Sequence, residues 1–324
     1  MLPFAYRRRR LLAALAAAGV APALFAQRNP APIKLIVPAA AGGSQDTLAR
    51  LVAEALSGLL ETPVRVENIP GDGGVTGTNA IVNAPRDGSV MGVASSSALL
   101  GGRLLSRNAQ FNPSEDFDWL AILGTYANAM IVSSRSNYTT LDQWLAAAKV
   151  AKTPLTYGSF GTGSAGHLAG AYLRIEQGAN LAHVSVSTAD DGYAMLSDGR
   201  LDAFFDGVPN ATIKMPRSGH RILAVTSAGR APALPDVPSF GETWQQSFII
   251  WIGLMLPKGV PPTTYVRLAT AVSVLLSEPT YADSMRAAGI TFMGLSGSGV
   301  RAFVEAEFLR NAKLVARLNE EGRR

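Results

Sequence analysis

The chain of 324 residues carries 29 lysines and arginines against 24 acidic residues, and 48% of its residues are hydrophobic. This length and composition predict a folded protein of about two domains rather than a disordered chain. Without cysteine, disulfides, thiolate metal sites and cysteine nucleophiles are excluded. The three histidines are widely spaced and form no metal motif, although a calcium site made only of carboxylates stays open.

Residues 1–26 have the pattern of an export signal. Four arginines at positions 7–10 precede a short apolar run and small residues, with cleavage expected after Ala23 or Ala26. The apolar run is far shorter than the roughly 20 residues of a membrane span. We therefore expect a periplasmic protein, exported by the general or the twin-arginine route.

The positive net charge belongs mostly to this signal. It holds four of the 29 basic residues and no acid, which leaves 25 basic and 24 acidic residues and a net charge of +1. The pI near 9.6 therefore does not indicate a nucleic-acid partner.

The first part of the chain alternates strands and helices. An apolar strand at 33–37 leads through a small-residue loop into an amphipathic helix that begins near Asp46. Asp46 either stabilises the helix start or orients a ligand or loop amide. Strands at 64–67 and 90–94 flank a helix at 78–84, and Ser95 begins a run of three serines where a strand ends. Hydroxyls at the carboxyl end of a strand are typical of ligand sites in α/β sheets.

The middle of the chain predicts a crossing into a second lobe. Two apolar segments at 119–123 and 130–133 indicate the crossing, and a capping-box spacing begins a helix that runs from 140 to about 150. Strands follow at 154–157, 183–186, 201–205 and 222–226, with a helix ending at 197 and Asp206 directly after the third of these strands.

A proline-rich linker at 234–238 precedes a strand at 249–256 that returns to the first lobe. Helices near 263–276 and 299–318 complete the chain. The alternation predicts an α/β fold, with mostly parallel sheets in two lobes that close on a central cleft.

The stretch 157–167 combines a strand end, a glycine loop and a helix start. This arrangement directs backbone N–H groups and the positive end of a helix dipole at an anion. Gly161, Gly163 and Gly166 also satisfy the dinucleotide pattern G-x-G-x-x-G, and Asp190 follows at about the distance of a ribose-binding acid. The glycines are equally explained by turn geometry alone.

Catalytic motifs are absent from the sequence. There is no G-x-S-x-G elbow and no P-loop lysine, and Ser164 with His167 lacks a third orienting acid. We therefore expect no enzyme and no bound cofactor. An exported NAD(P)-dependent oxidoreductase that uses the loop at 161–166 is the alternative.

A set of ordered motifs resembles the tripartite tricarboxylate transporter receptor family, also called Bug-type extracytoplasmic solute receptors. The similarity runs from about residue 33 to the C-terminus. The motifs are Ile36-Val37-Pro38 with Gly42-Gly43-x-x-Asp46, Val66-Glu67-Asn68-x-Pro70-Gly71-x-Gly73-Gly74, Asp87-Gly88, Tyr157-x-Ser159-x-Gly161-x-Gly163-Ser164-x-x-His167, His183-Val184, Gly199-x-Leu201-Asp202, Ala224-Val225-Thr226-Ser227 and Leu234-Pro235-Asp236-Val237-Pro238.

The resemblance implies a two-lobed, type II-like periplasmic binding protein with two mixed or parallel sheets. Lobe 1 would comprise residues 27–126 and 246–324, and lobe 2 residues 127–245. The protein would act as a monomer that captures a small carboxylate and delivers it to a large and a small permease subunit, or to a sensor protein. The ligand-binding residues we expect are Ala39, Ala41, Gly42, Gly43, Asp46, Gly73, Ser95, Ser159, Thr162, Gly163, Ser164, His167, Asp190 and Asp206.

Departures from the family pattern bear on the ligand. The chain has Ala39–Ala41 where the family commonly has Phe and Pro, and Asp72 at a usually neutral position. After His183-Val184, where the family usually continues Pro-Tyr-x-Gly with a later proline, the chain reads Ser185-Val186-Ser187-Thr188-Ala189-Asp190-Asp191. The aspartates at 190–191 either cap a helix or favour a ligand with a positive or donor end, such as an amino acid or an aromatic acid.

Overall fold

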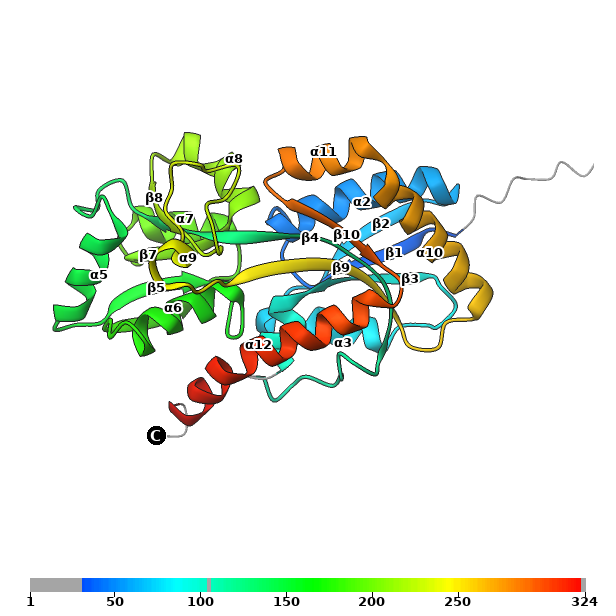
Figure 1. Ribbon diagram of the computed structural model, residues 1–324, viewed down its shortest axis with the longest axis horizontal. Helices are drawn as coiled ribbons and strands as arrows, with labels where there is room; N and C mark the ends of the chain where they lie inside the picture. Colours follow the sequence, from blue (N-terminus) through cyan, green and yellow to red (C-terminus); the bar gives the residue numbers. More distant parts are fainter. Residues whose placement is uncertain (1–30, 104–105, 322–324) are drawn as a thin grey trace, which may run out of the picture. The chain divides into compact units, whose positions relative to one another are not determined.

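Strand β4 (Phe117–Val132) runs through both halves of the sheet in the computed structural model (Figure 1). The structure describes residues 31–103 and 106–321, so the predicted signal at 1–26 lies outside the described residues. The two apolar segments predicted around 119 and 130 are one continuous strand of 16 residues. This strand passes from the first half of the sheet to the second, and Tyr126 and Asn128, which separate the two apolar segments in the sequence, are themselves buried.

The first half of the sheet is mixed. The strand order is β2-β1-β3-β9-β4, in which β1 pairs in parallel with β2 and β3, whereas β9 runs antiparallel to β3 and β4. A further strand, β10, pairs antiparallel with β4. The strands are β1 (Ile33–Val37), β2 (Val64–Asn68), β3 (Val90–Ser95), β9 (Ile249–Pro257) and β10 (Thr291–Ser296).

Helices cover both faces of this half (Figure 1). One face packs against α2 (Ser44–Leu60), α10 (Pro262–Ser277) and α11 (Pro279–Ala287), whose apolar residues form a buried cluster with β1. The other face packs against α3 (Val75–Val82), the π-helical turn η2 (Ser97–Gly102) and the start of α12 (Gly299–Glu321). The short 3₁₀ turn η1 (Asp72–Gly74) leads directly into α3.

The second half of the sheet continues from β4 in the order β7-β5-β6, and β8 also pairs with β4. Helices α5, α6 and α9 cover one face and α7 and α8 the other. The elements are β5 (Leu155–Ser159), β6 (Leu181–Ser185), β7 (Ala203–Gly207), β8 (Arg221–Val225), α5 (Leu141–Val150), α6 (Ala165–Ile175), α7 (Ala189–Ser197), α8 (Val208–Ser218) and α9 (Phe240–Trp244).

The predicted α/β architecture with two mixed sheets is confirmed, and the two sheets share β4. The strand at Ile33–Val37 and the helix ending at Val150 lie where the sequence placed them. The lobe boundaries at 126/127 and 245/246 stay predictions. Helix α8 was missed because it contains two prolines, although Pro209 lies in its first turn, where a missing N–H costs nothing.

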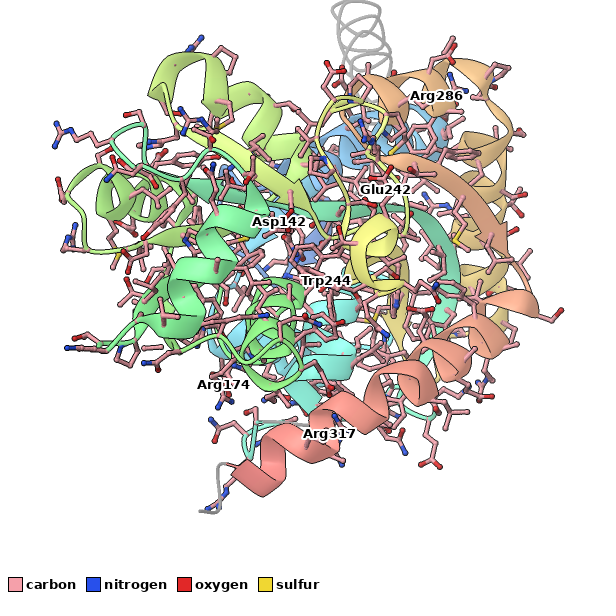
Figure 2. The ribbon with its side chains drawn as sticks, turned by 60° about the vertical axis from the view of Figure 1, so that its left-hand side comes forward. Asp142, Arg174, Glu242, Trp244, Arg286 and Arg317 are labelled. Atoms are coloured by element: carbon pink, nitrogen blue, oxygen red, sulfur yellow. The ribbon has the colours of Figure 1, made fainter. Side chains whose placement is uncertain are left out.

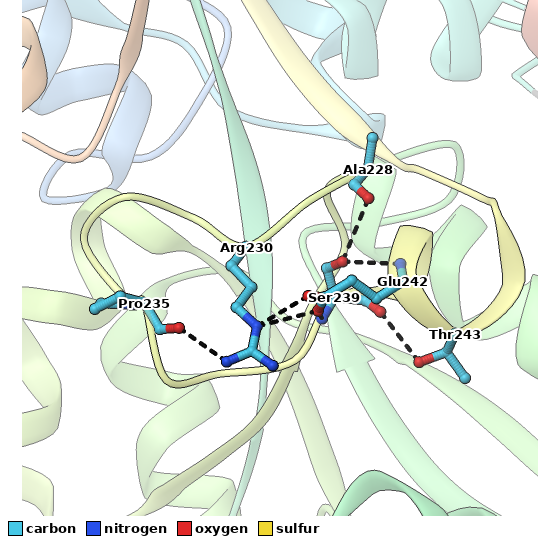
Figure 3. A network of polar contacts seen from close by, with 6 residues as sticks. All are labelled: Ala228, Arg230, Pro235, Ser239, Glu242 and Thr243. Carbon is cyan, nitrogen blue, oxygen red and sulfur yellow. Dashed lines mark hydrogen bonds and ion pairs between the residues drawn. The ribbon is translucent and has the colours of Figure 1, made fainter.

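Polar contacts hold two segments against the second half of the sheet, the loop that leads into α9 and the end of α12. Ser239, at the start of α9, accepts a hydrogen bond from Glu242 N–H, and the Glu242 carboxylate accepts from Ser239 N–H and from Arg230 (Figure 3). Figure 2 shows Arg317 on α12 beside α6, where it pairs with Glu176. Helix α12 therefore begins on the first half of the sheet and ends against the second.

Candidate functional site

A cavity of about 460 Å³ lies where loops from both halves of the sheet meet. Its wall consists mainly of segments that precede or begin helices. The lining residues are 38–41, 43–45, 70–74, 97, 126, 128, 160–162, 164–166, 185–189, 205–207 and 250. No lysine, arginine or histidine is among them in the part of the chain that the structure describes. Favourable interactions with an anion in this cavity would therefore come from backbone N–H groups and helix dipoles.

The start of α2 leaves its N–H groups open toward the cavity. Gly43, at the N-cap, makes no side-chain cap, and Ser44 and Gln45 in the first turn have no intrahelical acceptor for their N–H groups. Asp46 lies behind this turn and accepts hydrogen bonds from Gly42 N–H at 2.9 Å and from Arg50 at 3.0 Å. Burial alone would raise the pKa of Asp46, but these hydrogen bonds hold it below its ordinary value.

The glycine loop before α6 is held from both sides. Ser164 caps the helix by accepting from His167 N–H at 3.2 Å, and His167 Nδ1 in turn accepts from Gly163 N–H at 3.1 Å. Ser97, from the first half of the sheet, accepts from Ala165 N–H at 3.3 Å. Both Ser164 and Ala165 line the cavity, so the loop presents a fixed helix start to a ligand.

A buried cluster supports this loop from behind. Ser164 Oγ donates to Ser159 Oγ at 3.0 Å, and Ser159 Oγ lies 2.8 Å from His183 Nε2. The rings of His167 and His183 are 4.5 Å apart between centroids. Burial lowers the pKa of His183 to about 4, and burial together with the neighbouring His183 and Arg174 lowers that of His167 to about 3. Both imidazoles are therefore neutral at pH 7, as the acceptor role of His167 Nδ1 requires.

Asp206 is a buried carboxyl in the cavity wall, with 1% of its surface exposed. It accepts hydrogen bonds from Gly207 N–H at 2.8 Å, Tyr193 Oη at 3.2 Å and Asn210 Nδ2 at 2.5 Å. Burial raises the pKa of Asp206 to about 6, against the lowering effect of these hydrogen bonds. Burial and the nearby Asp206 also raise the pKa of Tyr126.

Half of the residues expected to bind a ligand line the cavity: Ala39, Ala41, Gly43, Gly73, Thr162, Ser164 and Asp206. The other seven lie outside the lining set: Gly42, Asp46, Ser95, Ser159, Gly163, His167 and Asp190. Most of these seven position a lining segment, as Asp46 and His167 do through backbone N–H groups. Their direct contact with a ligand stays a prediction.

The extra aspartates are placed in three different ways. Asp190 has 81% of its side chain exposed and pairs with Lys214. Asp191 accepts from the hydroxyl of Thr188, which itself caps α7. Asp72 lines the cavity and accepts from Ser106 and Asn108. Because Asp190 does not line the cavity, the dinucleotide interpretation lacks its ribose-binding acid.

Sequence reasoning missed several lining residues. Tyr126 and Asn128 lie between the two apolar segments of β4, and Ser97 rather than Ser95 contacts the start of α6. The alternation of Tyr126 and Asn128 along a strand was the available signal, because residues two apart share a face. Gln45 and Phe160 also line the cavity.

The described residues contain no cluster of three or more histidine, aspartate or glutamate side chains that could hold a metal ion. In the same part of the chain, no helix has the length and hydropathy needed to cross a membrane.

A family model and several curated proteins match the chain. The family model for the tripartite tricarboxylate transporter family receptor matches residues 48–320. Protein BugT of Bordetella pertussis is 30% identical over 94% of this chain and 96% of its own length. The UPF0065 protein of the tcbD-tcbE intergenic region of Pseudomonas sp. is 29% identical over 96% of this chain and 95% of its own.

Solved structures agree with the fold. The periplasmic binding protein BugD is 25% identical with a TM-score of 0.81, over 90% of this chain and 97% of that one. R. palustris Rpa4515, solved with adipate, is 26% identical with a TM-score of 0.83, over 89% and 97%. The family-model match spans most of the chain and the relatives match it almost end to end. The chain belongs to the tripartite tricarboxylate transporter receptor family.

Proposed function

We propose that this chain is a periplasmic receptor that closes two lobes on a small organic carboxylate and catalyses no reaction. The observation that supports it most directly is that the N-terminal ends of α2 and α6 both lie at one cavity, whose described lining residues include no cationic side chain. A carboxylate matches this site because its oxygens accept hydrogen bonds from several N–H groups at once.

The chemistry of such a site is reversible binding. Each helix start stabilises a negative charge by about 0.3–1 kcal/mol at an exposed site and up to about 2 kcal/mol when partly buried. The hydroxyls of Ser44, Ser97 and Ser164 lie at the same two helix starts. Ser159 is hydrogen-bonded to His183, but Ser159 is not among the lining residues, so this serine–histidine pair does not face the ligand.

The relatives support this assignment. Rpa4515 was solved with adipate, and BugD is described as a periplasmic binding protein. We extend both properties to this chain, with residues 1–26 as its export signal and 27–126 plus 246–324 against 127–245 as its lobes. Its partners would be a large and a small permease subunit or a sensor protein, reached as a monomer.

The test is binding by the purified chain without residues 1–26. Thermal unfolding and calorimetry with adipate, malate and simple monocarboxylates should reveal stabilisation, and the corresponding methyl esters should give none. A ligand at 100 times its Kd stabilises the folded state by about 2.7 kcal/mol, which is readily measured as a rise in Tm.

A matched pair of variants locates the site. Ala40→Asp places a negative charge in the cavity wall and should abolish binding, whereas Ala233→Asp, in an exposed turn, should leave it unchanged. Stabilisation by no carboxylate, or equal binding by both variants, would refute the proposed function.

A further inference from the structure

Among the described residues, two polar side-chain atoms of the cavity wall are buried and have no hydrogen-bond partner. These are Asn128 Nδ2, a donor, and Gln45 Oε1, an acceptor, and both residues line the cavity. Asn128 has only 3% of its surface exposed. An unsatisfied buried polar group costs about 1–3 kcal/mol, so two of them in one cavity indicate groups that a ligand completes.

The position of Asn128 is fixed by its backbone. Asn128 N–H donates to Thr226 Oγ1 and Asn128 O accepts from Thr226 N–H, both at 2.9 Å. The side chain is therefore held at one point on β4, directly opposite Gly207 on β7 and beside Tyr126 on the same face. A binding group that needs no reorganisation gives both affinity and selectivity.

Gln45 reaches the same region from α2. A Cβ on Gly207 would lie 2.4 Å from Ser44 Oγ and 2.9 Å from Tyr126 Cε2, so the start of α2 lies against the end of β7. Ser44 Oγ also accepts from Asn210 N–H at 3.2 Å. Gln45 and Asn128 therefore lie in the part of the cavity where α2, β4 and β7 meet.

The charges in this region oppose an anion. Asp206, next to Gly207, accepts hydrogen bonds only from neutral donors. Lys214, whose charge acts on Asp206, is paired with Asp190, which does not line the cavity. Asp72 adds a second carboxyl to the wall. A second carboxylate of the ligand would lose its water here without meeting a cation, beside a buried carboxyl of the protein.

We propose that the ligand is a monocarboxylate whose other end carries an uncharged group that both donates and accepts hydrogen bonds, such as a primary carboxamide. Asn128 Nδ2 donates to its carbonyl oxygen and Gln45 Oε1 accepts from its NH₂ group. The proposal rests on the proposed function, because the N-terminal end of α6 holds the ligand carboxylate while the other end of the ligand lies where α2, β4 and β7 meet.

Probes of equal length separate the three kinds of end group. Adipate, 5-carbamoylpentanoate and 6-aminohexanoate share one chain and end in a carboxylate, a carboxamide and an ammonium group. The same design one carbon shorter uses glutarate, 4-carbamoylbutanoate and 5-aminopentanoate. By calorimetry at pH 7.5, the carbamoyl acid of at least one series should bind tenfold or more tightly than its diacid and its amino acid.

Two variants test the residues. Asn128→Asp keeps the size but removes the donor, and it should shift the preference to the amino acid probe. Gln45→Leu, at a half-buried helix position, should reduce the carbamoyl preference to about threefold or less without the folding risk of a core change. Thermal unfolding of both variants establishes that they fold.

The outcomes are distinct. If carboxylates bind but the diacids or amino acids bind best, or if neither variant changes the preference, this inference is wrong and the proposed function stands. If no probe with a carboxylate binds, both are wrong.

Discussion

Ser44 Oγ accepts a hydrogen bond from Asn210 N–H at 3.2 Å, although the two residues are 166 positions apart in the chain. Helix α8 begins after Gly207 and has no side-chain cap of its own, so Ser44 supplies that cap from α2. Ser97 bonds Ala165 N–H at the start of α6 in the same way. Serine hydroxyls from segments that pack on the first half of the sheet therefore cap helices of the second half.

Ser44→Ala should lower the free energy of unfolding by about 1 kcal/mol, the usual cost of losing an N-cap hydrogen bond. Urea unfolding measures this change. Thr47→Ala is the matched control, because the Thr47 hydroxyl is exposed and donates only to Gly43 O within its own helix. Equal effects of the two substitutions would show that the bond to Asn210 adds no stability.

Gly101→Ala should weaken ligand binding at least tenfold. A Cβ at Gly101 would lie 1.7 Å from Gly163 O, so the η2 turn and the glycine loop could not approach as closely as they do. Gly58→Ala is the control, because a Cβ there meets nothing within 4 Å. Calorimetry with the strongest-binding carboxylate measures both variants, and an unchanged affinity for Gly101→Ala would contradict the prediction.

Ser239→Ala should cost about 1–2 kcal/mol of unfolding free energy, at the upper end for a cap. Ser239 is fully buried, accepts from Glu242 N–H at 3.0 Å and donates to Ala228 O at 3.4 Å, so the substitution removes two hydrogen bonds at once (Figure 3). Thr140→Ala removes a more exposed cap that accepts from Gln143 N–H, and it should cost less. Urea unfolding measures both variants. A cost for Ser239→Ala that is no larger than that for Thr140→Ala would contradict the prediction.

The sequence predicted elements whose patterns are local. The β-branched run at Ile33–Val37 and the cap at Thr140 define β1 and the start of α5 without reference to the rest of the fold. Helix α8 has no such local pattern, because it contains two prolines and its N-terminal cap comes from Ser44 in the distant helix α2. Local patterns do not reveal a cap that only the folded chain supplies.

The candidate site was predicted in outline because part of it also has a local pattern in the sequence. Glycine loops before helices indicated both helix starts, as Gly43 and Ser164 in the cavity wall illustrate. Asn128 gave no such signal, because a polar residue in an apolar run reads as a break rather than as a buried strand position. Its role depends on the pairing of β4 with β7, which sequence alone does not specify.

Acid should destabilise the protein through His167 and His183. His167 and His183 have pKa values lowered by burial to about 3 and about 4, against an ordinary value near 6.5. Between pH 6.5 and pH 4, the unfolded chain therefore binds protons at these residues and the folded chain does not. Each histidine therefore lowers the free energy of unfolding by about 1.4 kcal/mol per pH unit as the pH falls through this window.

Asp206 acts in the opposite direction over part of the same range. Its pKa is raised by burial to about 6, so between pH 6 and pH 4 the folded chain holds a proton there that the unfolded chain has released. The contribution of Asp206 to the free energy of unfolding therefore rises as the pH falls, and it offsets about as much as one of the two histidines loses. Asp206→Asn removes this offset, and unfolding free energies measured between pH 6 and pH 4 should fall more steeply in the variant by about 1.4 kcal/mol per pH unit. Parallel profiles for the two proteins would show that Asp206 does not take up a proton in this range.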